Sequence, residues 1–303
     1  MKVRKAVLPV AGMGTRFLPA TKVSPKEMLT VVDKPLVQYA IEEAFAAGIE
    51  QVILVNGRGK GVLEDHFDRA PELEESLKSR GKEALLDLVH ASTPQPGRVV
   101  SVRQMQALGL GHAVLCAREA VGNEPFAILL PDDLMWGEPP VLKQMTEAFE
   151  TTQRSMLAVM EVPSDQTDKY GILDIMEEGT GGGDGRLSQI RAMVEKPPPG
   201  SAPSNLAVMG RYILTPEIFP LLARQGSGAG GEIQLTDAMA ALLSEQTIHG
   251  FRFQGTRYDC GDKAGWQMAN LSLALERDDL RERLLPFLRE TLEVWQNNQS
   301  SKD

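Results

Sequence analysis

The sequence predicts an α/β protein built on a doubly wound, mostly parallel sheet, and three observations support this fold class. Short apolar runs alternate with helical patterns through the first half of the chain. Such alternation favours parallel strands joined by right-handed helical crossovers. The length of 303 residues allows one large domain with a sizeable core. We expect a mixed-strand extension in the second half and helices at the C-terminus.

The first half of the chain contains four expected strands with helices between them. The strands cover residues 5–10, 51–55, 99–104 and 126–131. Asp33 is the expected N-cap of a helix that Gly48 ends, and shorter helices reach Phe67 and cover residues 111–121. Residues 72–90 are rich in Glu, Lys and Leu, which predicts an amphipathic insertion with a charged outer face.

The second half changes character, because its expected strands are short and joined by turns. They cover residues 155–162, 169–176, 187–197, 206–214 and 251–255, and helices are expected in the segments TPEIFPLL and EIQLTDAMAALLSEQ. Residues 177–186 read as a flexible hairpin loop without a function. From Asp262 the pattern is helical to about Gln296, and residues 297–303 read as a frayed tail.

A glycine-rich loop follows the first strand, in the segment from Leu8 to Met28. Gly12 and Gly14 predict a sharp turn that exposes backbone N–H groups, with Arg16 and Lys26 behind it. Residues 1–34 carry a net charge of +5 in a chain whose net charge is -9. The dinucleotide fingerprint and the P-loop both fail, because Phe17 stands where each needs another residue. The loop therefore predicts a polyphosphate site, with a solvated basic turn as the alternative.

Three features lie at the carboxyl ends of expected strands. They are the glycine loop, Gln104, and the pair Asp132 and Asp133. Ligands of doubly wound sheets gather at this edge, so a site is expected there. Mg²⁺ commonly binds one or two carboxylates together with substrate phosphates, although an Asp-Asp pair is also common in plain turns. The turn GRGKG at 57–61 fits no ligand motif and reads as a surface turn.

The motif G-x-G-T-R-x-L-P-x-T-K-x-x-P-K-E-M, followed by VVDKPLVQYAIEEA, resembles the signature of sugar-1-phosphate nucleotidylyltransferases. Among these it is most similar to the bacterial UTP–glucose-1-phosphate uridylyltransferases. Thr30 departs from the proline usual in that family, which we expect to affect only local rigidity. The resemblance covers roughly residues 3–275. It implies a Rossmann-like fold of the nucleotide-diphospho-sugar transferase type, with a nucleotide-binding half at about 1–150 and a sugar-binding half at about 151–260.

The same resemblance implies Mg²⁺-assisted transfer of UMP from UTP to glucose 1-phosphate, which gives UDP-glucose and pyrophosphate. It assigns phosphate-handling, catalytic roles to Arg16, Lys26 and Lys196. The implied nucleotide-binding residues are Ala11, Gly12, Gly14, Thr15, Glu27, Gln104 and Gly109. The implied sugar-binding residues are Gly171, Glu195 and Glu232, and the implied metal ligands are Asp132 and Asp259.

Several of these residues could also be ordinary surface residues. Glu195 and Lys196 also read as an exposed ion pair, and Asp259 as part of a surface turn. A side-chain amide such as that of Gln104 can satisfy both the carbonyl and the imide N–H of a pyrimidine. Gln104, Gly109 and His112 lie in the segment RQMQALGLGHAV, which is similar to the family's base-recognition loop. His112 is expected to be structural, because the reaction needs no strong base.

Composition excludes several other classes of protein. The acidic balance and the absence of a basic, aromatic stripe argue against nucleic acid, and no apolar run is long enough for a membrane helix. Cys116 and Cys260 have no metal-like spacing, which is typical of a reduced, cytoplasmic protein. A homo-oligomer assembled through helices in 262–297 is expected. The alternatives are the same reaction with dTTP, CTP or another sugar phosphate, and a non-catalytic nucleotide-sugar sensor.

Overall fold

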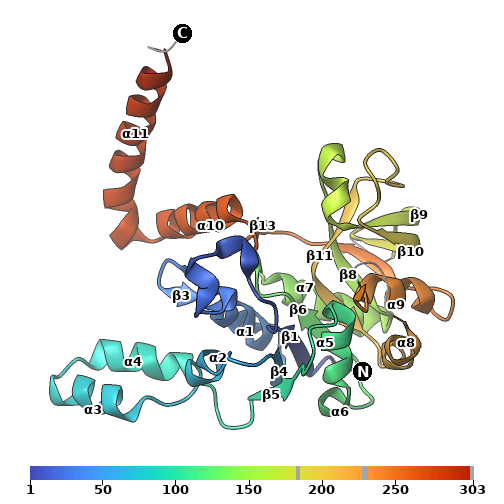
Figure 1. Cartoon of the computed structure of the whole chain (residues 1–303), viewed down its shortest axis with the longest axis horizontal. Helices are drawn as coiled ribbons and strands as arrows, with labels where there is room; N and C mark the ends of the chain where they lie inside the picture. The colour runs from blue at the N-terminus through green and yellow to red at the C-terminus, as the bar shows by residue number, and fades with distance from the viewer. Residues whose placement is uncertain (182–184, 227–230, 301–303) are drawn as a thin grey trace.

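A nine-stranded sheet runs through the computed structural model, which describes residues 1–181, 185–226 and 231–300 (Figure 1). The strand order is β5-β4-β1-β6-β11-β8-β12-β10-β9. The strands are β1 (Lys5–Pro9), β4 (Gln51–Asn56), β5 (Val99–Arg103), β6 (Phe126–Leu129), β8 (Met156–Glu161), β9 (Gly171–Gly181), β10 (Leu187–Glu195), β11 (Leu206–Leu214) and β12 (His249–Arg252). All nine coincide with expected strands, within a few residues at their ends.

The strands of the N-terminal half, β5, β4, β1 and β6, are parallel to one another. From β6 onward the sheet is mixed, because β11 is antiparallel to β6 and β8, whereas β12 is parallel to β8 and antiparallel to β10. The expectation of a mostly parallel sheet therefore holds for the N-terminal half and fails for the sheet as a whole. The expected mixed extension is confirmed.

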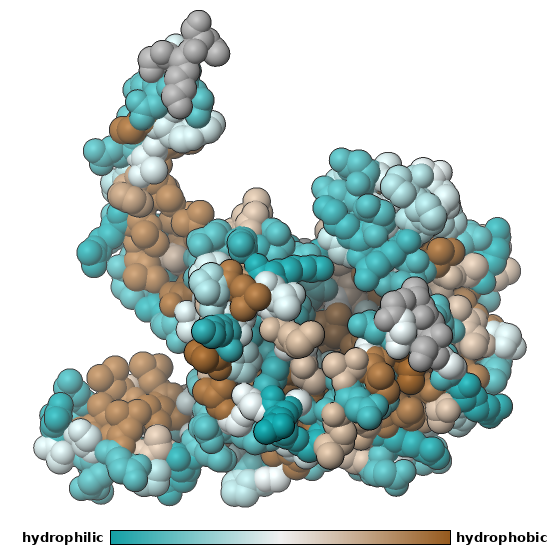
Figure 2. Space-filling model, in the orientation of Figure 1, coloured by the Kyte–Doolittle hydropathy of each residue, from teal (hydrophilic) through white to brown (hydrophobic). Residues whose placement is uncertain are grey.

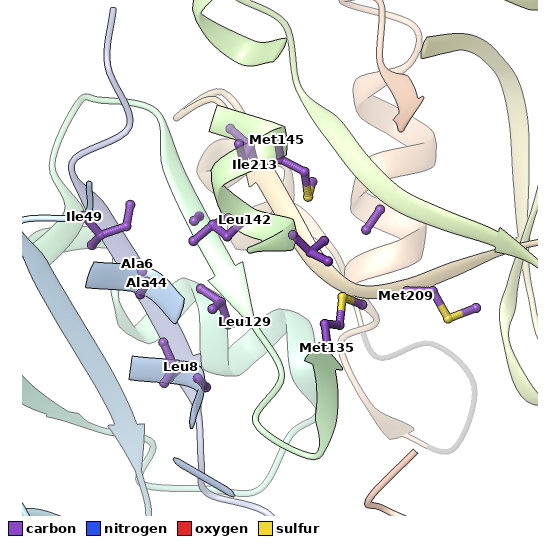
Figure 3. Close-up of a cluster of buried hydrophobic side chains, with 14 of the residues drawn as sticks. Ala6, Leu8, Ala44, Ile49, Leu129, Met135, Leu142, Met145, Met209 and Ile213 are labelled. Carbon is purple, nitrogen blue, oxygen red and sulfur yellow. The ribbon is translucent and has the colours of Figure 1, made fainter. Parts of the chain in front are cut away.

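Helices cover both faces of the sheet. One face packs against α1 (Leu36–Ala46) and α7 (Val141–Thr152), where Ala44, Leu142 and Met145 meet sheet residues such as Leu8 and Leu129 (Figure 3). The other face packs against α5 (Leu110–Cys116), α6 (Arg118–Val121), α8 (Ile218–Arg224) and α9 (Leu235–Leu242). This three-layer arrangement leaves the carboxyl ends of the parallel strands accessible at one edge.

A buried ion pair links helix α1 to the centre of the sheet. Arg211 of β11 has a side chain only 1% exposed, and its Nη2 donates to Glu43 Oε2 at 2.7 Å. Its Nη1 donates to the carbonyls of Leu130 and Gly210, while Glu43 accepts from the amide of Leu142 at 3.0 Å. The pair thus joins α1, α7, β11 and the end of β6.

Several local expectations are corrected by the structure. Asp33 does not cap the first helix, because β2 (Thr30–Val31) and β3 (Lys34–Pro35) form a small hairpin there and Pro35 is the N-cap. Residues 177–181, expected in a loop, continue β9, and residues 182–184 lie outside the described part of the chain. Two further short strands were not foreseen: β7 (Asp133–Trp136) pairs antiparallel with β13 (Thr256–Asp259).

Two helical segments project from the body of the molecule (Figure 1). The expected insertion is a hairpin of α3 (Pro71–Ser79) and α4 (Glu83–Ser92), reached through α2 (Val62–Asp65). At the C-terminus α10 (Lys263–Glu276), capped by Asp262, leads into α11 (Asp278–Ser300), so the expected frayed tail is helical through Ser300. Both projections carry apolar surface (Figure 2). Among the described residues, no helix has the length and apolar character needed to cross a bilayer.

Candidate active site

The glycine loop after β1 is shaped by close contact with Lys26. Gly14 adopts φ 64°, and an ideal Cβ on it would lie 3.1 Å from Lys26 Cβ and 3.4 Å from Thr21 Cβ. Thr21 Oγ1 donates to the Gly14 carbonyl at 2.6 Å. A glycine at 14 is therefore required both by the backbone conformation and by the packing of the lysine against the loop. Gly12 lies under the same side chain, near Lys26 Cε.

Lys26 reaches across the sheet edge to the end of β6. Its Nζ donates to Asp132 Oδ2 at 2.5 Å, and both side chains are about one-quarter exposed. Burial alone would lower the pKa of Lys26, but Asp132 and Glu27 outweigh it and raise that pKa above its usual value. Burial would likewise raise the pKa of Asp132, and the nearby Lys26 holds it below the usual range. Both groups are therefore charged at neutral pH.

Gly261 marks a small space on which two carboxylates and a guanidinium converge. An ideal Cβ at Gly261 would lie 3.0 Å from Asp132 Oδ2, 3.1 Å from Asp259 Oδ1 and 3.7 Å from Arg16 Nη1. Asp132 and Asp259 thus face the same space, although they are far apart in the sequence. Two carboxylates with room between them suit Mg²⁺, which completes its shell with water and substrate phosphates. Among the described residues, no group of three or more His, Cys, Asp or Glu side chains is placed to hold a metal ion, so a cation here would take its other ligands from water and substrate.

Asp133 has a different environment from its neighbour Asp132. It is buried, and it accepts hydrogen bonds from the Gly210 amide at 2.7 Å and from Arg257 Nε at 2.8 Å and Nη2 at 2.5 Å. Burial works against the charge on Arg257, but Asp133 and Asp259 raise the pKa of that guanidinium. Since both Asp133 oxygens are engaged, this residue fixes strand β13 to the end of the main sheet. It thereby positions Asp259 opposite Asp132.

The GRGKG turn supports the glycine loop from behind, a role that the sequence did not suggest. Lys60 of this turn donates to Glu27 Oε2 at 2.8 Å, and both side chains are buried. Burial raises the pKa of the Glu27 carboxyl, with Lys60 opposing the shift. Glu27 Oε1 is buried without a partner among the described residues. Glu27 follows Lys26 directly, so the ion pair anchors the backbone that carries the lysine.

The base-recognition loop predicted around Gln104 closes against the segment EIQLTD. Gly109 has φ 94°, and an ideal Cβ there would lie 2.7 Å from Glu232 Cβ, so no larger residue fits. The Ile233 amide donates to the Leu108 carbonyl at 2.7 Å. Glu232 therefore lies beside the predicted nucleotide-binding residue Gly109, and its sugar contact stays a prediction.

Two predicted sugar residues, Gly171 and Glu195, meet where β9 begins and β10 ends. Glu195 is paired in register with Gly171, and an ideal Cβ on Gly171 would lie 3.3 Å from Glu195 Oε2. That same oxygen accepts from Thr236 Oγ1 at 2.7 Å, and Lys196 Nζ lies 3.6 Å from Glu195 Oε1. The Glu195 side chain is only 23% exposed, so the alternative of an exposed ion pair does not describe it. The Lys196 side chain is 61% exposed, and its backbone adopts φ 44°.

Two cavities adjoin the carboxylates that converge at Gly261, one at Asp132 and one at Asp259. One of about 360 Å³ is lined by most of the predicted nucleotide residues, namely Ala11, Gly12, Glu27, Gln104 and Gly109. The predicted catalytic Lys26, the predicted metal ligand Asp132 and the predicted sugar residue Glu232 line the same cavity. The other, of about 660 Å³, is lined by Arg16, Lys196 and Asp259 together with Tyr170 and Arg257. Gly14, Thr15, Gly171 and Glu195 line neither cavity. The arrangement can hold a polyphosphate between two compartments, with cations from both sides.

Three residues that support this site were not singled out from the sequence. They are Lys60, Thr236 and Arg257, which hold Glu27, Glu195 and Asp133 respectively. Lys60 lies in the GRGKG turn, Thr236 in EIQLTD, and Arg257 two residues before Asp259. Each of the three acts through a contact with a distant part of the chain. Only Thr236 could have been suspected from the sequence, because it lies in the same segment as the predicted sugar residue Glu232.

Known proteins resemble this chain along nearly its whole length. The model of the nucleotidyl transferase family matches residues 5–274. The UTP–glucose-1-phosphate uridylyltransferase of Bacillus subtilis (strain 168) is 50% identical over 287 residues, which cover 95% of this chain and 96% of that protein.

Solved structures give the same result. A UTP-bound UGPase from Acinetobacter baumannii has a TM-score of 0.86 and 44% identity, covering 95% of this chain and 99% of the other. A UDP-glucose pyrophosphorylase complexed with UDP-glucose has a TM-score of 0.79 and 44% identity, covering 91% and 100%. With a glycine loop, cations and carboxylates assembled as that family's motif predicts, the chain belongs to the nucleotidyl transferase family.

Proposed function

We propose that this chain transfers the uridylyl group of UTP to glucose 1-phosphate and releases pyrophosphate. The observation that carries the proposal is the convergence of Lys26, Arg16, Asp132 and Asp259 around Gly261, between the two cavities. It is supported by relatives named for this activity and by relatives solved with UTP and with UDP-glucose. Pyrophosphate release, measured across four nucleoside triphosphates and several sugar 1-phosphates, tests it, and preference for another pair would overturn it.

The reaction needs positioning and charge compensation more than acid–base chemistry. The phosphate oxygen of glucose 1-phosphate is already ionised at neutral pH, and it attacks the α-phosphorus of UTP in line while pyrophosphate leaves. Charge spreads over the transferring group, so fixed cations lower the barrier. Lys26 and Arg16 bind the triphosphate and the leaving pyrophosphate, and Lys196 neutralises the incoming phosphate from the other cavity.

Mg²⁺ is the proposed cofactor, held by Asp132 and Asp259. The fit rests on the space at Gly261, where both carboxylates lie within about 3 Å of the position a Cβ would fill. When bound, the ion acts as a Lewis acid toward the phosphate oxygens. The chain's own part is to fix both carboxylates, through the Asp133–Arg257 hydrogen bonds between β7 and β13.

The nucleotide and the sugar are proposed to occupy different halves of the chain. Ala11, Gly12, Gly14, Thr15, Gln104 and Gly109 surround the nucleotide, with Glu27 supporting the loop from below. Glu195 accepts hydrogen bonds from glucose hydroxyls, and Gly171 lets the sugar ring approach the backbone. Thr236 holds the Glu195 carboxylate, and Glu232 is proposed to help close the sugar pocket.

A homo-oligomer assembled through α11 is also proposed. None of the 23 residues of this helix is buried, and it carries Phe287, Leu292, Val294 and Trp295, each more than half exposed. Isolated helices depend on packing for most of their stability, so a helix of this kind needs a partner surface. A second copy of the chain supplies a self-complementary one.

Lys26→Ala and Arg16→Ala are each expected to lower kcat/KM by at least ~10²-fold, the loss typical when a preorganised donor to developing charge is removed. Arg16 faces the space at Gly261, and Lys26 donates to Asp132, one of the two carboxylates that border this space. Steady-state kinetics of pyrophosphate release measure the effect. Lys22→Ala is the matched control, because Lys22 belongs to the same segment but is exposed and lines neither cavity. Equal, small effects in all three variants would remove Lys26 and Arg16 from the transition-state contacts.

Glu195→Gln and Gln104→Ala are expected to separate the two substrates. Glu195→Gln keeps the side-chain size and weakens hydrogen bonds from sugar hydroxyls, which costs roughly 1.5–3 kcal/mol for a charged acceptor. The loss of about tenfold to a hundredfold appears in kcat/KM for glucose 1-phosphate. Gln104→Ala is instead expected to weaken the binding of UTP, which a calorimetric titration measures. If Glu195→Gln weakens UTP binding as much as Gln104→Ala does, the assignment of substrates to separate halves is wrong.

A further inference from the structure

The side-chain amide of Gln104 is held by two partners at the closed end of the smaller cavity. Gln104 follows β5 and is 9% exposed, and its backbone amide donates to the Asn56 carbonyl at 2.9 Å. Its Nε2 lies 3.1 Å from the Gly109 carbonyl oxygen and 3.0 Å from His112 Nδ1. Among the described residues, no donor is recorded for Gln104 Oε1. This leaves the amide oxygen available to a ligand.

The identity of each atom in this contact follows from its partners. A backbone carbonyl only accepts hydrogen bonds, so the amide atom beside Gly109 must be the nitrogen. That nitrogen has two hydrogens and no lone pair to offer, so His112 Nδ1 must be the acceptor of the second one. In this contact Nδ1 is therefore the ring nitrogen that accepts. The Gly109 carbonyl and His112 together consume both N–H groups of the amide.

We propose that His112 is a positioning residue that makes Gln104 an obligate acceptor toward the base. The inference rests on the proposed function, in which Gln104 contacts the pyrimidine of UTP. Uracil offers an N–H at N3, whereas cytosine offers a lone pair there, and enzymes read this edge by hydrogen bonds. An amide locked with its oxygen outward pairs with uracil and leaves two acceptors facing each other with cytosine. His112 thereby contributes to selection of UTP over CTP without touching the nucleotide.

The surroundings of His112 leave this contact without strong competition. The imidazole is in the first turns of α5, partly buried. Cys116, one turn further along, lies 3.9 Å from both ring nitrogens, which is a weak thiol contact with the ring. Gln104 is therefore the main polar partner recorded for Nδ1 among the described residues. The amide expected from sequence to satisfy both a carbonyl and an N–H of the base is thus committed to acceptance alone.

His112→Leu removes the acceptor, frees one amide N–H and allows the amide to turn over. Loss of one neutral hydrogen bond to a buried partner predicts a fall of roughly tenfold in the ratio of kcat/KM for UTP to that for CTP. The fall arises from KM for UTP, while kcat and KM for glucose 1-phosphate stay nearly unchanged. A parallel loss with UTP and CTP would indicate a merely structural role and overturn the inference.

Two polar variants separate the position of the acceptor from the packing of α5. His112→Asn places a side-chain oxygen where Nδ1 was and is expected to restore most of the UTP preference. His112→Gln carries the same group one bond further out, near the former Nε2, and is expected not to restore it. Because both are polar and similar in size, they test the inference even if His112→Leu folds poorly. Equal preference in the two variants would contradict it.

Gln104→Ala provides the last comparison, because a residue that acts through Gln104 has no effect without it. In the Gln104→Ala background, His112→Leu is expected to change the UTP/CTP ratio by less than about twofold, as a double-mutant cycle requires for coupled residues. A full, additive loss would show that His112 acts by another route. If Gln104→Ala alone leaves the ratio unchanged, the failure lies in the proposed base contact, and the positioning role falls with it.

Discussion

Asp132→Ala is expected to lower Mg²⁺-dependent turnover by at least ~10³-fold while the fold stays intact. Lewis-acid stabilisation by a bound metal ion contributes several kcal/mol, and each 1.36 kcal/mol is about tenfold in rate. The variant removes a carboxylate that faces the space at Gly261 and leaves Lys26 without its partner. Pyrophosphate release measures turnover, circular dichroism checks the fold, and the paramagnetic signal of bound Mn²⁺ reports metal affinity independently of activity.

Asp165→Ala is the matched control for Asp132, because Asp165 is an exposed aspartate that lines neither cavity. It should bind Mn²⁺ and turn over like the unmodified chain. Retention of tight Mn²⁺ binding in Asp132→Ala would remove Asp132 from the metal site. Retention of activity would in addition exclude its contact with the phosphates.

Glu43→Ala is expected to cost about 3–5 kcal/mol of unfolding free energy, the typical effect of leaving one member of a buried ion pair alone. Arg211 would keep its charge at 1% exposure with only two carbonyls as partners, and the Leu142 amide would lose its acceptor. Urea unfolding followed by fluorescence measures the loss. The effect on kcat under native conditions should be small, because neither Glu43 nor Arg211 lines the two cavities of the candidate active site.

Glu42→Ala serves as the control on the same helix. Glu42 pairs with Lys34 at the surface, with both side chains about 40% exposed, and exposed pairs contribute roughly 0–1 kcal/mol. The double variant Glu43→Leu/Arg211→Met should be less destabilised than the sum of its single variants, because no unpaired charge remains buried. Equal destabilisation by Glu42→Ala and Glu43→Ala would show that the buried pair has no special weight.

The parts of this molecule that depend on local pattern could be predicted from the sequence. Every strand of the main sheet was foreseen, since a buried strand is a short apolar run between turn residues. The rule that ligands gather at the carboxyl ends of parallel strands places the glycine loop, Gln104 and Asp132 together, and the structure does bring them to one cavity. The family resemblance added Asp259, which the structure places opposite Asp132.

What escaped prediction depends on contacts between distant segments. The strands β7 and β13 are short, and each exists only because the other pairs with it. The sequence left open whether Asp133 joins Asp132 in the metal site, and only the position of Arg257 shows that Asp133 is held in an ion pair. Lys60 read as a surface lysine because nothing in GRGKG indicates that its side chain is buried against Glu27. Charged residues committed to such long-range pairs have no local signature.

The position of β12 in the sheet has a consequence for biosynthesis. This strand lies between β8 and β10, yet it is made after both of them, because it begins only at His249. At about 5–20 residues per second, roughly three to ten seconds pass on the ribosome between the end of β10 and the arrival of β12. Until then β8 has an unpaired edge, and among the described residues the β9–β10 hairpin pairs with the rest of the sheet only where Ile172 meets Ala207. Open strand edges pair readily with other chains, so the nascent polypeptide is most exposed to aggregation in this interval.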